Sequence, residues 1–470
     1  MKRLRWHLKM KNNAIIIGAG ISGLTTAFLL KKNGLNVTVL EAENEVGGTM
    51  KSKRINDYLV ELGPNSALET TPLLKQIIDE VGISNEMVYA SEVSNKRYIF
   101  KNGKLYPIPM KPQEFFKSKL WSWRGKLRIM LEPFHGRAKN TTGDPFWEET
   151  VAQFVRRRLG KEFLDYTINP FVAGVYAGDP EKLGVRSAFP RLYALEEKYG
   201  GLIIGTIKGA KERKKREEKA KITAKMFSFL DGMGTLPNAI ANYLGNSVIT
   251  GAKVKSIKKD VKGYIVEFEK DGGTENLFSE VVVVSTPAYA ASEILKKLSD
   301  KIESALKQIY YPPVAEVIFG YEKEQIGVEL DGFGYLIPEK ERRKILGTLW
   351  NSAIFPKRAP EGYVELTTFV GGTRQPELAL KNDDELIKIV SDELKDIMKV
   401  KGEPKFVWIS RWEKAIPQYN VGHLKIMAMI DEFEKENPGI YLCANYRGGI
   451  SVGDCVISAE KTANKILSEK

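Results

Sequence analysis

The stretch that decides the fold runs from residue 14 to residue 41 and reads AIIIGAGISGLTTAFLLKKNGLNVTVLE. Ala14 to Gly18 is a short apolar run with β-branched residues, which predicts a buried strand. After a G-x-G-x-x-G turn, Leu24 to Lys32 predicts a helix that ends before Gly34, and Asn36 to Leu40 predicts a second strand. This order of elements predicts an α/β unit of the Rossmann type.

Each glycine of the turn has its own physical reason. Gly18 allows the tight turn, Gly20 lets the backbone approach a pyrophosphate, and Gly23 lets the helix pack closely on the strand. The free N–H groups and the positive dipole at the helix start favour phosphate, and an acid at the end of the second strand accepts hydrogen bonds from ribose hydroxyls. The residues expected at this dinucleotide site are Gly18, Ala19, Gly20, Ile21, Ser22, Gly23, Leu24, Glu41 and Ala42.

Composition describes a folded chain of 470 residues with 43% hydrophobic and 28% charged residues and a net charge of +13. The positive charge favours an anionic partner: nucleic acid, a membrane surface or a charged small molecule. Two cysteines and three histidines are too few for a disulfide framework, a zinc cluster or an evident Ser-His-Asp triad. No apolar run reaches the roughly 18 residues of a membrane span, and the basic start lacks the apolar core of a signal peptide. We therefore expect an intracellular protein.

The first unit alone leaves NAD and FAD open. Two further glycine turns follow it, within Glu45 to Thr49 and within Glu61 to Ser66. Near the far end, Gly439 to Ala444 predicts a strand, Asn445 to Cys455 a glycine-rich loop and Val456 to Leu467 a helix. A second loop that leads into a helix N-terminus suits the electron-rich edge of a flavin ring, so these additions favour FAD.

The middle of the chain adds four distinct stretches. Ser247 to Lys270 alternates polar and apolar residues and predicts antiparallel strands, and Val281 to Pro287 predicts a buried strand that returns to the nucleotide domain. Lys208 to Lys221, with eight basic and three acidic residues, predicts a solvated loop or helix. Asn169 to Leu192 holds three glycines and three prolines, a composition that is typical of a surface loop but leaves a functional role equally open.

Residues 96–137 contain eleven Lys and Arg but two Glu, interleaved with Trp and Phe. This composition suits an anionic membrane interface or nucleic acid. It equally suits an ordinary pair of packed helices with one solvated face. The composition by itself leaves all three open.

Together these pieces resemble the flavoprotein superfamily of amine oxidases, carotenoid desaturases and protoporphyrinogen oxidases. Thr49 stands where that superfamily often has arginine. From Asn13 to Leu467 the chain is similar to the FAD-dependent, oxygen-using protoporphyrinogen oxidases. The matching segments are GVYAG (174–178), SAFP (187–190), KRYIF (96–100), GKLYPIP (103–109), GFGYLIP (332–338), GTL (347–349), TTFVGG (367–372) and IPQY (416–419).

The resemblance implies an α/β plus α+β architecture with a domain assembled from distant segments. The expected parts are a Rossmann-type FAD-binding domain (10–89, 225–300 and 405–470), a helical membrane-associated domain (90–205), a basic loop (206–224) and a substrate domain with a mixed sheet (301–404). The basic aromatic segment falls inside the helical part, which favours the membrane interpretation.

The resemblance also implies residue roles. Arg97 pairs with a substrate propionate, and the carbonyl of Gly174 approaches the pyrrole nitrogens. Leu336 and Leu349 lie on one face of the macrocycle and Phe369 on the other. Further FAD contacts are expected at Gly48, Thr49, Gly63, Pro64, Asn65, Ser66, Val254, Ile450, Ser451 and Val452.

The implied activity is oxidation of protoporphyrinogen IX to protoporphyrin IX in haem biosynthesis, by three FAD-mediated two-electron steps with O2 as acceptor and H2O2 as product. Coproporphyrinogen III is the alternative substrate, and an amine oxidase, a carotenoid desaturase or a basic binding protein are more distant alternatives. The expected location is the cytoplasm, peripheral on the inner face of the cell membrane through residues 96–137. A ferrochelatase is the expected recipient of the product, and no nucleic acid is expected as partner.

Overall fold

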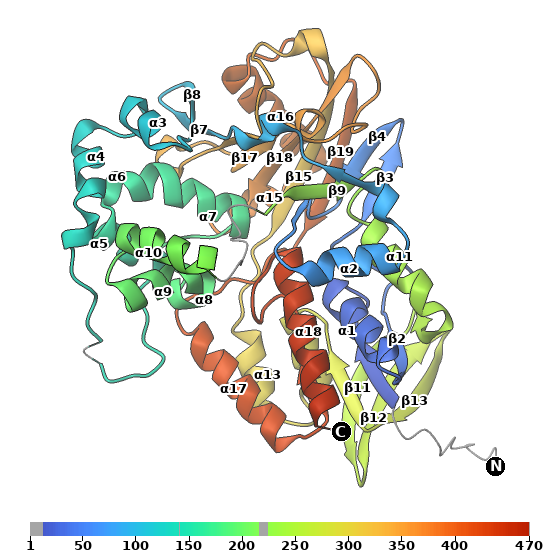
Figure 1. Cartoon of the computed structure of the whole chain (residues 1–470). Coiled ribbons are helices and arrows are strands. Elements are labelled where there is room, and N and C mark those ends of the chain that lie inside the picture. Colours follow the sequence, from blue (N-terminus) through green and yellow to red (C-terminus); the bar gives the residue numbers. More distant parts are fainter. Residues whose placement is uncertain (1–12, 141, 216–223, 470) are drawn as a thin grey trace.

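The computed structural model describes residues 13–140, 142–215 and 224–469 of the chain. A parallel sheet with helices, a mixed sheet and a group of helices lie around one centre (Figure 1). Residues 10–12 of the expected first segment and 216–223 of the expected basic loop lie outside the described residues.

The fold-deciding stretch forms the middle of a five-stranded parallel sheet, as predicted. Helix α1 (Ile21–Lys32) connects the two strands of this stretch, β1 and β2, which are neighbours in the sheet. Strands from the middle and the end of the chain complete the sheet, so three distant segments build one nucleotide-binding domain. The strand order is β10 (Val248–Ile249), β2 (Asn36–Leu40), β1 (Asn13–Ile17), β14 (Val281–Val284) and β20 (Ile440–Leu442).

Both faces of this sheet are covered. On one face α1 packs with α11 (Thr235–Leu244) and α18 (Val452–Ser468) around Leu24, Phe28 and Val456. Helix α18 begins at Val452 rather than Val456, because the Ser451 hydroxyl accepts a hydrogen bond from the Asp454 N–H and caps it. The other face carries α12 (Ala288–Leu295), α13 (Asp300–Lys307), α17 (His423–Glu436) and the antiparallel strands β11 (Lys253–Asp260), β12 (Gly263–Lys270) and β13 (Gly273–Ser279).

The mixed sheet has seven strands, of which only β16 and β7 are paired in parallel. One face packs on α16 (Asp383–Ile397) through Leu386, Val390 and Leu394. Three of its strands come from outside the segment 301–404: β7 and β8 belong to the segment 90–205, and β19 belongs to the segment 405–470. The strand order is β19 (Phe406–Trp412), β15 (Val314–Glu322), β18 (Tyr363–Gly371), β17 (Gly347–Leu349), β16 (Gly334–Leu336), β7 (Tyr98–Lys101) and β8 (Lys104–Pro107).

Smaller elements connect the two sheets. Strand β4 (Tyr58–Glu61) lies against the second face of the mixed sheet, where an added Cβ at Gly320 would be 2.4 Å from the Tyr58 ring. The remaining elements of this region are β3 (Ser52–Ile55), β5 (Ala67–Leu68), α2 (Pro72–Glu80), β6 (Met87–Tyr89), β9 (Met226–Phe229), α14 (Asn351–Ile354) and α15 (Pro376–Ala379).

A group of helices lies beside the mixed sheet (Figure 1). No helix among the described residues is both long and apolar enough to cross a bilayer. Residues 206–215, where the basic stretch left a loop or a helix open, are helical, since Lys, Arg, Glu and Ala are good helix formers. The helices are α3 (Pro112–Lys117), α4 (Trp123–Met130), α5 (Val151–Arg158), α6 (Lys161–Phe163), α7 (Asn169–Tyr176), α8 (Val185–Ala188), α9 (Pro190–Tyr199) and α10 (Leu202–Lys215).

The surface-loop interpretation of Asn169 to Leu192 is wrong for most of this stretch, because residues 185–188 and 190–192 are also helical, in α8 and α9. Residues 169–176 form helix α7, which continues a π-helical turn over Leu164–Ile168. Pro170 falls at the start of α7, where a proline is tolerated. The helix ends at Ala177, which adopts a left-handed conformation with φ +48°.

Candidate functional site

The glycines of the first turn differ in what surrounds them. A Cβ at Gly23 would be 2.1 Å from the Gly18 oxygen, so only glycine lets α1 pack this closely on β1. Gly18 has φ +103°, in the region that favours glycine. A Cβ at Gly20 meets nothing within 4 Å, so the backbone of Gly20 borders open space. A phosphate group has room to approach at this point.

The start of α1 provides free donors. Leu24 is buried and its N–H already donates to the Gly20 oxygen at 2.9 Å. The N–H groups of Ile21, Ser22 and Gly23 have no hydrogen-bond partner among the described residues, and no side chain caps the helix. Unbonded N–H groups at the positive end of a helix dipole are the donor set that a diphosphate requires, so this turn fits a dinucleotide.

Glu41 is held in place at the end of β2. Its Oε2 accepts from the Ala19 N–H at 2.6 Å and its Oε1 from the Glu43 N–H at 3.0 Å. Exposed Ala42 follows it, and the Ala252 N–H donates to the Glu41 carbonyl at 2.7 Å. Val254, two residues farther along, is buried, so any contact with a nucleotide falls to its backbone. The carboxylate has lone pairs left for ribose hydroxyls.

Two further turns lie directly on the fingerprint. The Gly47 N–H donates to the Ala19 oxygen at 2.8 Å, and a Cβ at Gly48 would be 3.4 Å from Gly20 Cα. A Cβ at Gly63 would be 2.1 Å from the exposed Thr49's carbonyl oxygen. Glycines from three separate turns therefore let the backbone segments around Gly20, Gly48 and Gly63 pack closely against one another.

The two ends of the chain meet beyond this layer. A Cβ at Gly453 would be 2.1 Å from Thr70 Oγ1, so the start of α18 lies against the segment that follows Gly63–Ser66. Ile450 is half-buried, Ser451 exposed and Val452 buried at that helix start. The structure thus gathers the expected cofactor residues of both chain ends around the carboxyl ends of the parallel strands.

The expected substrate walls share one face of the mixed sheet. Phe369 pairs with Gly347, and Gly347 pairs with Leu336. Cross-strand partners point to the same side, so Leu336 and Phe369 stand two strand spacings apart, roughly 10 Å. Gly347 lies between them and places no side chain on this face. Leu349 points to this face from the next pleat, where it pairs with Thr367.

Helix α7 crosses this face. A Cβ at Gly174 would be 2.7 Å from Leu336 Cδ2, and Phe369 packs with Ala173 and Ala177. The N–H groups of Ala177 and Gly178 both donate to the Val172 oxygen. Consequently the carbonyl of Gly174 has no hydrogen-bond partner among the described residues. It offers an acceptor at the negative end of the helix dipole.

A half-buried arginine, which the sequence patterns did not indicate, holds α7 against the sheet. Arg374 Nη1 donates to the Ile337 oxygen at 2.8 Å, and Nη2 donates to the Asn169 oxygen at 2.8 Å and to Asn169 Oδ1 at 2.7 Å. Burial lowers the pKa of Arg374 to about 10. At the other end of α7, Gln418 Nε2 donates to the Tyr176 oxygen at 2.7 Å.

Arg97 precedes β7 at the edge of the same region. Its guanidinium lies 5.2 Å from the centre of the Phe333 ring, and it has no carboxylate partner among the described residues. Neighbouring atoms displace part of its hydration, which lowers the pKa of Arg97 from its usual range. Phe333 in turn lines a small cavity with Asn65 and Ser66. By contrast, the adjacent Lys96 is paired with Asp331.

Buried acids behind the site were also missed. Glu61 pairs with Arg358 at 3.0 Å, whereas Glu316 and Glu365 have no ion pair among the described residues. Burial raises the pKa of both Glu316 and Glu365 well above the ordinary value. A single acid within an apolar strand, as in VAEVIF (314–319), was the signal that could have found Glu316.

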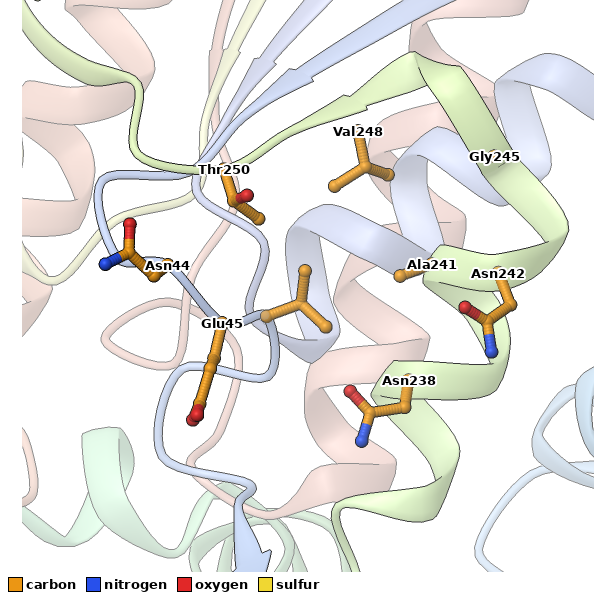
Figure 2. A pocket seen from close by; sticks show the side chains of 9 residues that line it. Asn44, Glu45, Asn238, Ala241, Asn242, Gly245, Val248 and Thr250 are labelled. Carbon is orange, nitrogen blue, oxygen red and sulfur yellow. The ribbon is translucent and has the colours of Figure 1, made fainter. Parts of the chain in front are cut away.

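A separate groove of about 480 Å³ opens at the edge of the parallel sheet (Figure 2). It lies between Asn44–Val46 on one side and α11 with residues 245–250 on the other. Asn238 and Asn242 project into its rim from α11 (Figure 2). None of the expected cofactor residues lines this groove, so it is distinct from the fingerprint site.

Comparison with known proteins covers almost the whole chain. The family model of flavin containing amine oxidoreductases matches residues 21–467. Protoporphyrinogen oxidase 2, chloroplastic/mitochondrial, of Arabidopsis thaliana is 34% identical, over 96% of this chain and 93% of that protein. Coproporphyrinogen III oxidase of Bacillus subtilis (strain 168) is 30% identical, over 97% of this chain and 98% of that protein.

A solved chain from Exiguobacterium sp. 255-15 has the same fold, with a TM-score of 0.80 at 24% identity over 98% of this chain and 100% of that chain. The family match confirms FAD as the expected cofactor. The chain therefore belongs to the family of flavin-containing amine oxidoreductases, in the group that includes the protoporphyrinogen and coproporphyrinogen III oxidases.

Proposed function

We propose that this oxidoreductase converts protoporphyrinogen IX to protoporphyrin IX in haem biosynthesis, in three two-electron steps with O2 as acceptor and H2O2 as product. The observation that carries the proposal is the carbonyl of Gly174, which has no hydrogen-bond partner among the described residues and belongs to the helix that crosses the face of Leu336 and Phe369. A porphyrinogen has pyrrole N–H donors around an apolar ring. An isolated acceptor within apolar walls suits that pattern.

FAD supplies the two-electron acceptor when it is bound. The residues of the chain bind the cofactor and the substrate and orient one against the other. The α1 N-terminus holds the diphosphate, and Glu41 accepts from ribose hydroxyls. Leu336, Leu349 and Phe369 exclude water from the ring, and the carbonyl of Gly174 accepts from its N–H groups. Such positioning suits a site whose chemistry needs orientation more than an acid–base pair.

The substrate choice rests on Arg97. Protoporphyrinogen IX carries two propionates and coproporphyrinogen III carries four. The guanidinium of Arg97 has no carboxylate partner among the described residues. A planar guanidinium donates two parallel hydrogen bonds to one carboxylate, so Arg97 can bind one propionate. We favour the substrate with fewer charges. Coproporphyrinogen III remains the second candidate, because a 30% identical relative is named for it.

The proposal includes peripheral contact with an anionic membrane. Exposed apolar side chains gather within 110–134, beside Lys111, Lys117, Lys119 and Arg124. Apolar side chains with flanking cations suit a headgroup boundary. The exposed residues are Met110, Phe116, Trp123, Leu127, Met130, Leu131 and Phe134. A cytoplasmic location on the inner face of the membrane and delivery of the product to a ferrochelatase complete the proposal.

Anaerobic mixing tests the reaction. Protoporphyrinogen IX added to the yellow holoprotein should bleach the flavin absorbance, and O2 should restore it with release of H2O2. A flavin that stays yellow would refute the oxidase proposal. Turnover with the two porphyrinogens then decides the substrate: faster oxidation of coproporphyrinogen III overturns our choice.

A further inference from the structure

Strand β15 carries one acid within an otherwise apolar run. Glu316 pairs with Phe369 on β18 and with Ser410 on β19, so all three side chains point to the same face of the mixed sheet. This is the face of Leu336 and Leu349, opposite to the core formed with α16. Glu316 retains 5% of its surface exposed.

The carboxyl group of Glu316 has an unmet hydrogen-bonding capacity. Its Oε2 is enclosed and without a hydrogen-bond partner among the described residues. Burial and the nearby charge of Glu61 raise the pKa of Glu316 well above the ordinary value. Glu61 already holds Arg358, so the neighbouring cation is engaged. These surroundings favour a neutral carboxylic acid, whose O–H group seeks an acceptor.

A neighbour of Glu316 on β15 lies between the two proposed sites. Val314, the preceding residue on the same face, packs with Ala173 and Ala177 of α7. Trp412 pairs with Val314 across β19, and its Nε1–H donates to the Leu62 oxygen at 2.6 Å. Leu62 leads directly into the Gly63–Ser66 turn. Val314 therefore lies between the helix that carries Gly174 and the segment that leads into this turn, and Glu316 follows it two residues farther along the same face, near Glu61.

We propose that Glu316, as a neutral acid, donates a hydrogen bond to the ring system of FAD and thereby favours its reduced state. Reduction adds electron density to the ring, so a donor stabilises the reduced form more than the oxidised one. The proposal rests on the proposed placement of the ring in this site. It does not depend on which porphyrinogen is oxidised.

The test is the reduction potential of the bound flavin, measured with an artificial reductant and without substrate. Glu316→Leu removes the donor and should shift the reduction equilibrium about tenfold towards the oxidised form. A factor of this size corresponds to the free-energy contribution of one hydrogen bond. For a two-electron couple this is a fall of about 30 mV. Glu316→Gln keeps a neutral donor of the same size and should retain the wild-type potential.

Glu365 provides the matched control. It is also buried, and neither of its carboxyl oxygens has a hydrogen-bond partner among the described residues. Glu365 pairs with Gly320 on the same face, four residues from Phe369 along β18. Glu365→Leu should leave the potential unchanged. An unchanged potential in Glu316→Leu, or an equal fall in Glu365→Leu, overturns the proposal. If Glu316→Leu does not retain FAD, the unbranched Glu316→Met gives the same readout.

These measurements separate the two proposals. A wild-type flavin that porphyrinogen does not bleach refutes the proposed function. The potentials of the Glu316 and Glu365 variants are still measured in that case, and they decide the hydrogen bond on their own. A normal turnover together with an unchanged potential in Glu316→Leu refutes only the role of Glu316.

Discussion

The first βαβ unit and the proposed substrate slot, the face of the mixed sheet that carries Leu336, Leu349 and Phe369 beneath α7, are built in opposite ways. The unit is continuous in sequence, from Asn13 to Leu40, and its function resides in backbone N–H groups and missing side chains. The slot joins α7 to strands that lie about two hundred residues away, as the Asn169–Arg374 hydrogen bonds with a separation of 205 residues show. Its proposed function depends on side chains and on the carbonyl of Gly174.

The difference determines how each region can fail. A substitution in the glycine turn Gly18–Gly23 should either block cofactor binding or disrupt the packing of α1 on β1. We expect few intermediate effects there. A substitution in the slot changes distances between elements, so its effect is graded. The following variants test this contrast, from the largest expected effect to the smallest.

Gly20→Val should abolish FAD binding and leave the protein folded. A Cβ at Gly20 meets nothing within 4 Å of protein, so the added side chain occupies only the space through which a phosphate approaches. The flavin absorbance per mole of protein and the thermal unfolding curve measure the two effects. Gly136→Val is the matched control, because Gly136 is also open and should stay yellow. A fully flavinated Gly20→Val protein contradicts the fingerprint assignment.

Gly174→Ala should keep FAD and lower kcat about a hundredfold, the order expected for a displacement of roughly 1 Å at a reacting group. The new Cβ would be 2.7 Å from Leu336 Cδ2, so α7 or the Leu336 side chain must move. Steady-state kinetics of porphyrinogen oxidation measures the loss.

The double variant Gly174→Ala with Leu336→Val sharpens this result. A shorter side chain at Leu336 relieves the contact, so part of the lost rate should return. If nothing returns, the alanine acts on the substrate itself and not on the separation of α7 from β16. Unchanged turnover in Gly174→Ala alone removes Gly174 from the site.

Arg374→Met should lower kcat about tenfold and the free energy of unfolding by about 3 kcal/mol, since two backbone carbonyls and one amide oxygen lose a charged donor. Steady-state kinetics measures kcat, and chemical denaturation measures the free energy of unfolding. Arg411→Met, at an exposed arginine of the same sheet, is the control and should change neither. Loss of stability with an unchanged kcat would mean that Arg374 does not set the position of α7.

Arg97→Ala should raise KM about tenfold with little change in kcat, because a propionate loses one charge-assisted pair at the rim of the slot. Titration of the initial rate with substrate concentration separates the two constants. Lys96→Ala is the matched control, since Lys96 is already paired with Asp331. A KM that stays at the wild-type value counts against a contact between Arg97 and the substrate.

Local patterns predicted the nucleotide-binding half well. The strands at residues 14–18, 36–40 and 281–287 all lie in one parallel sheet, as expected, since their apolar runs require burial on both sides. The same patterns failed at residues 169–176, where glycine and proline suggested a loop. Tertiary contacts at both ends of α7, from Arg374 and Gln418, stabilise a helix there.

The resemblance to known flavoproteins implied that the chain's end returns to the first sheet, whereas the residues by themselves determined the Rossmann unit and the acid at Glu41. These features depend on backbone sterics and on hydrophobic periodicity, which are local properties. Only the tertiary structure decided that Leu336, Leu349 and Phe369 share a face and that Arg374 holds α7 above them. It also decided that Glu316 is buried, with its Oε2 unpartnered among the described residues. Such relations depend on which distant strands pair and in which register, and a one-residue slip would turn every side chain to the other face.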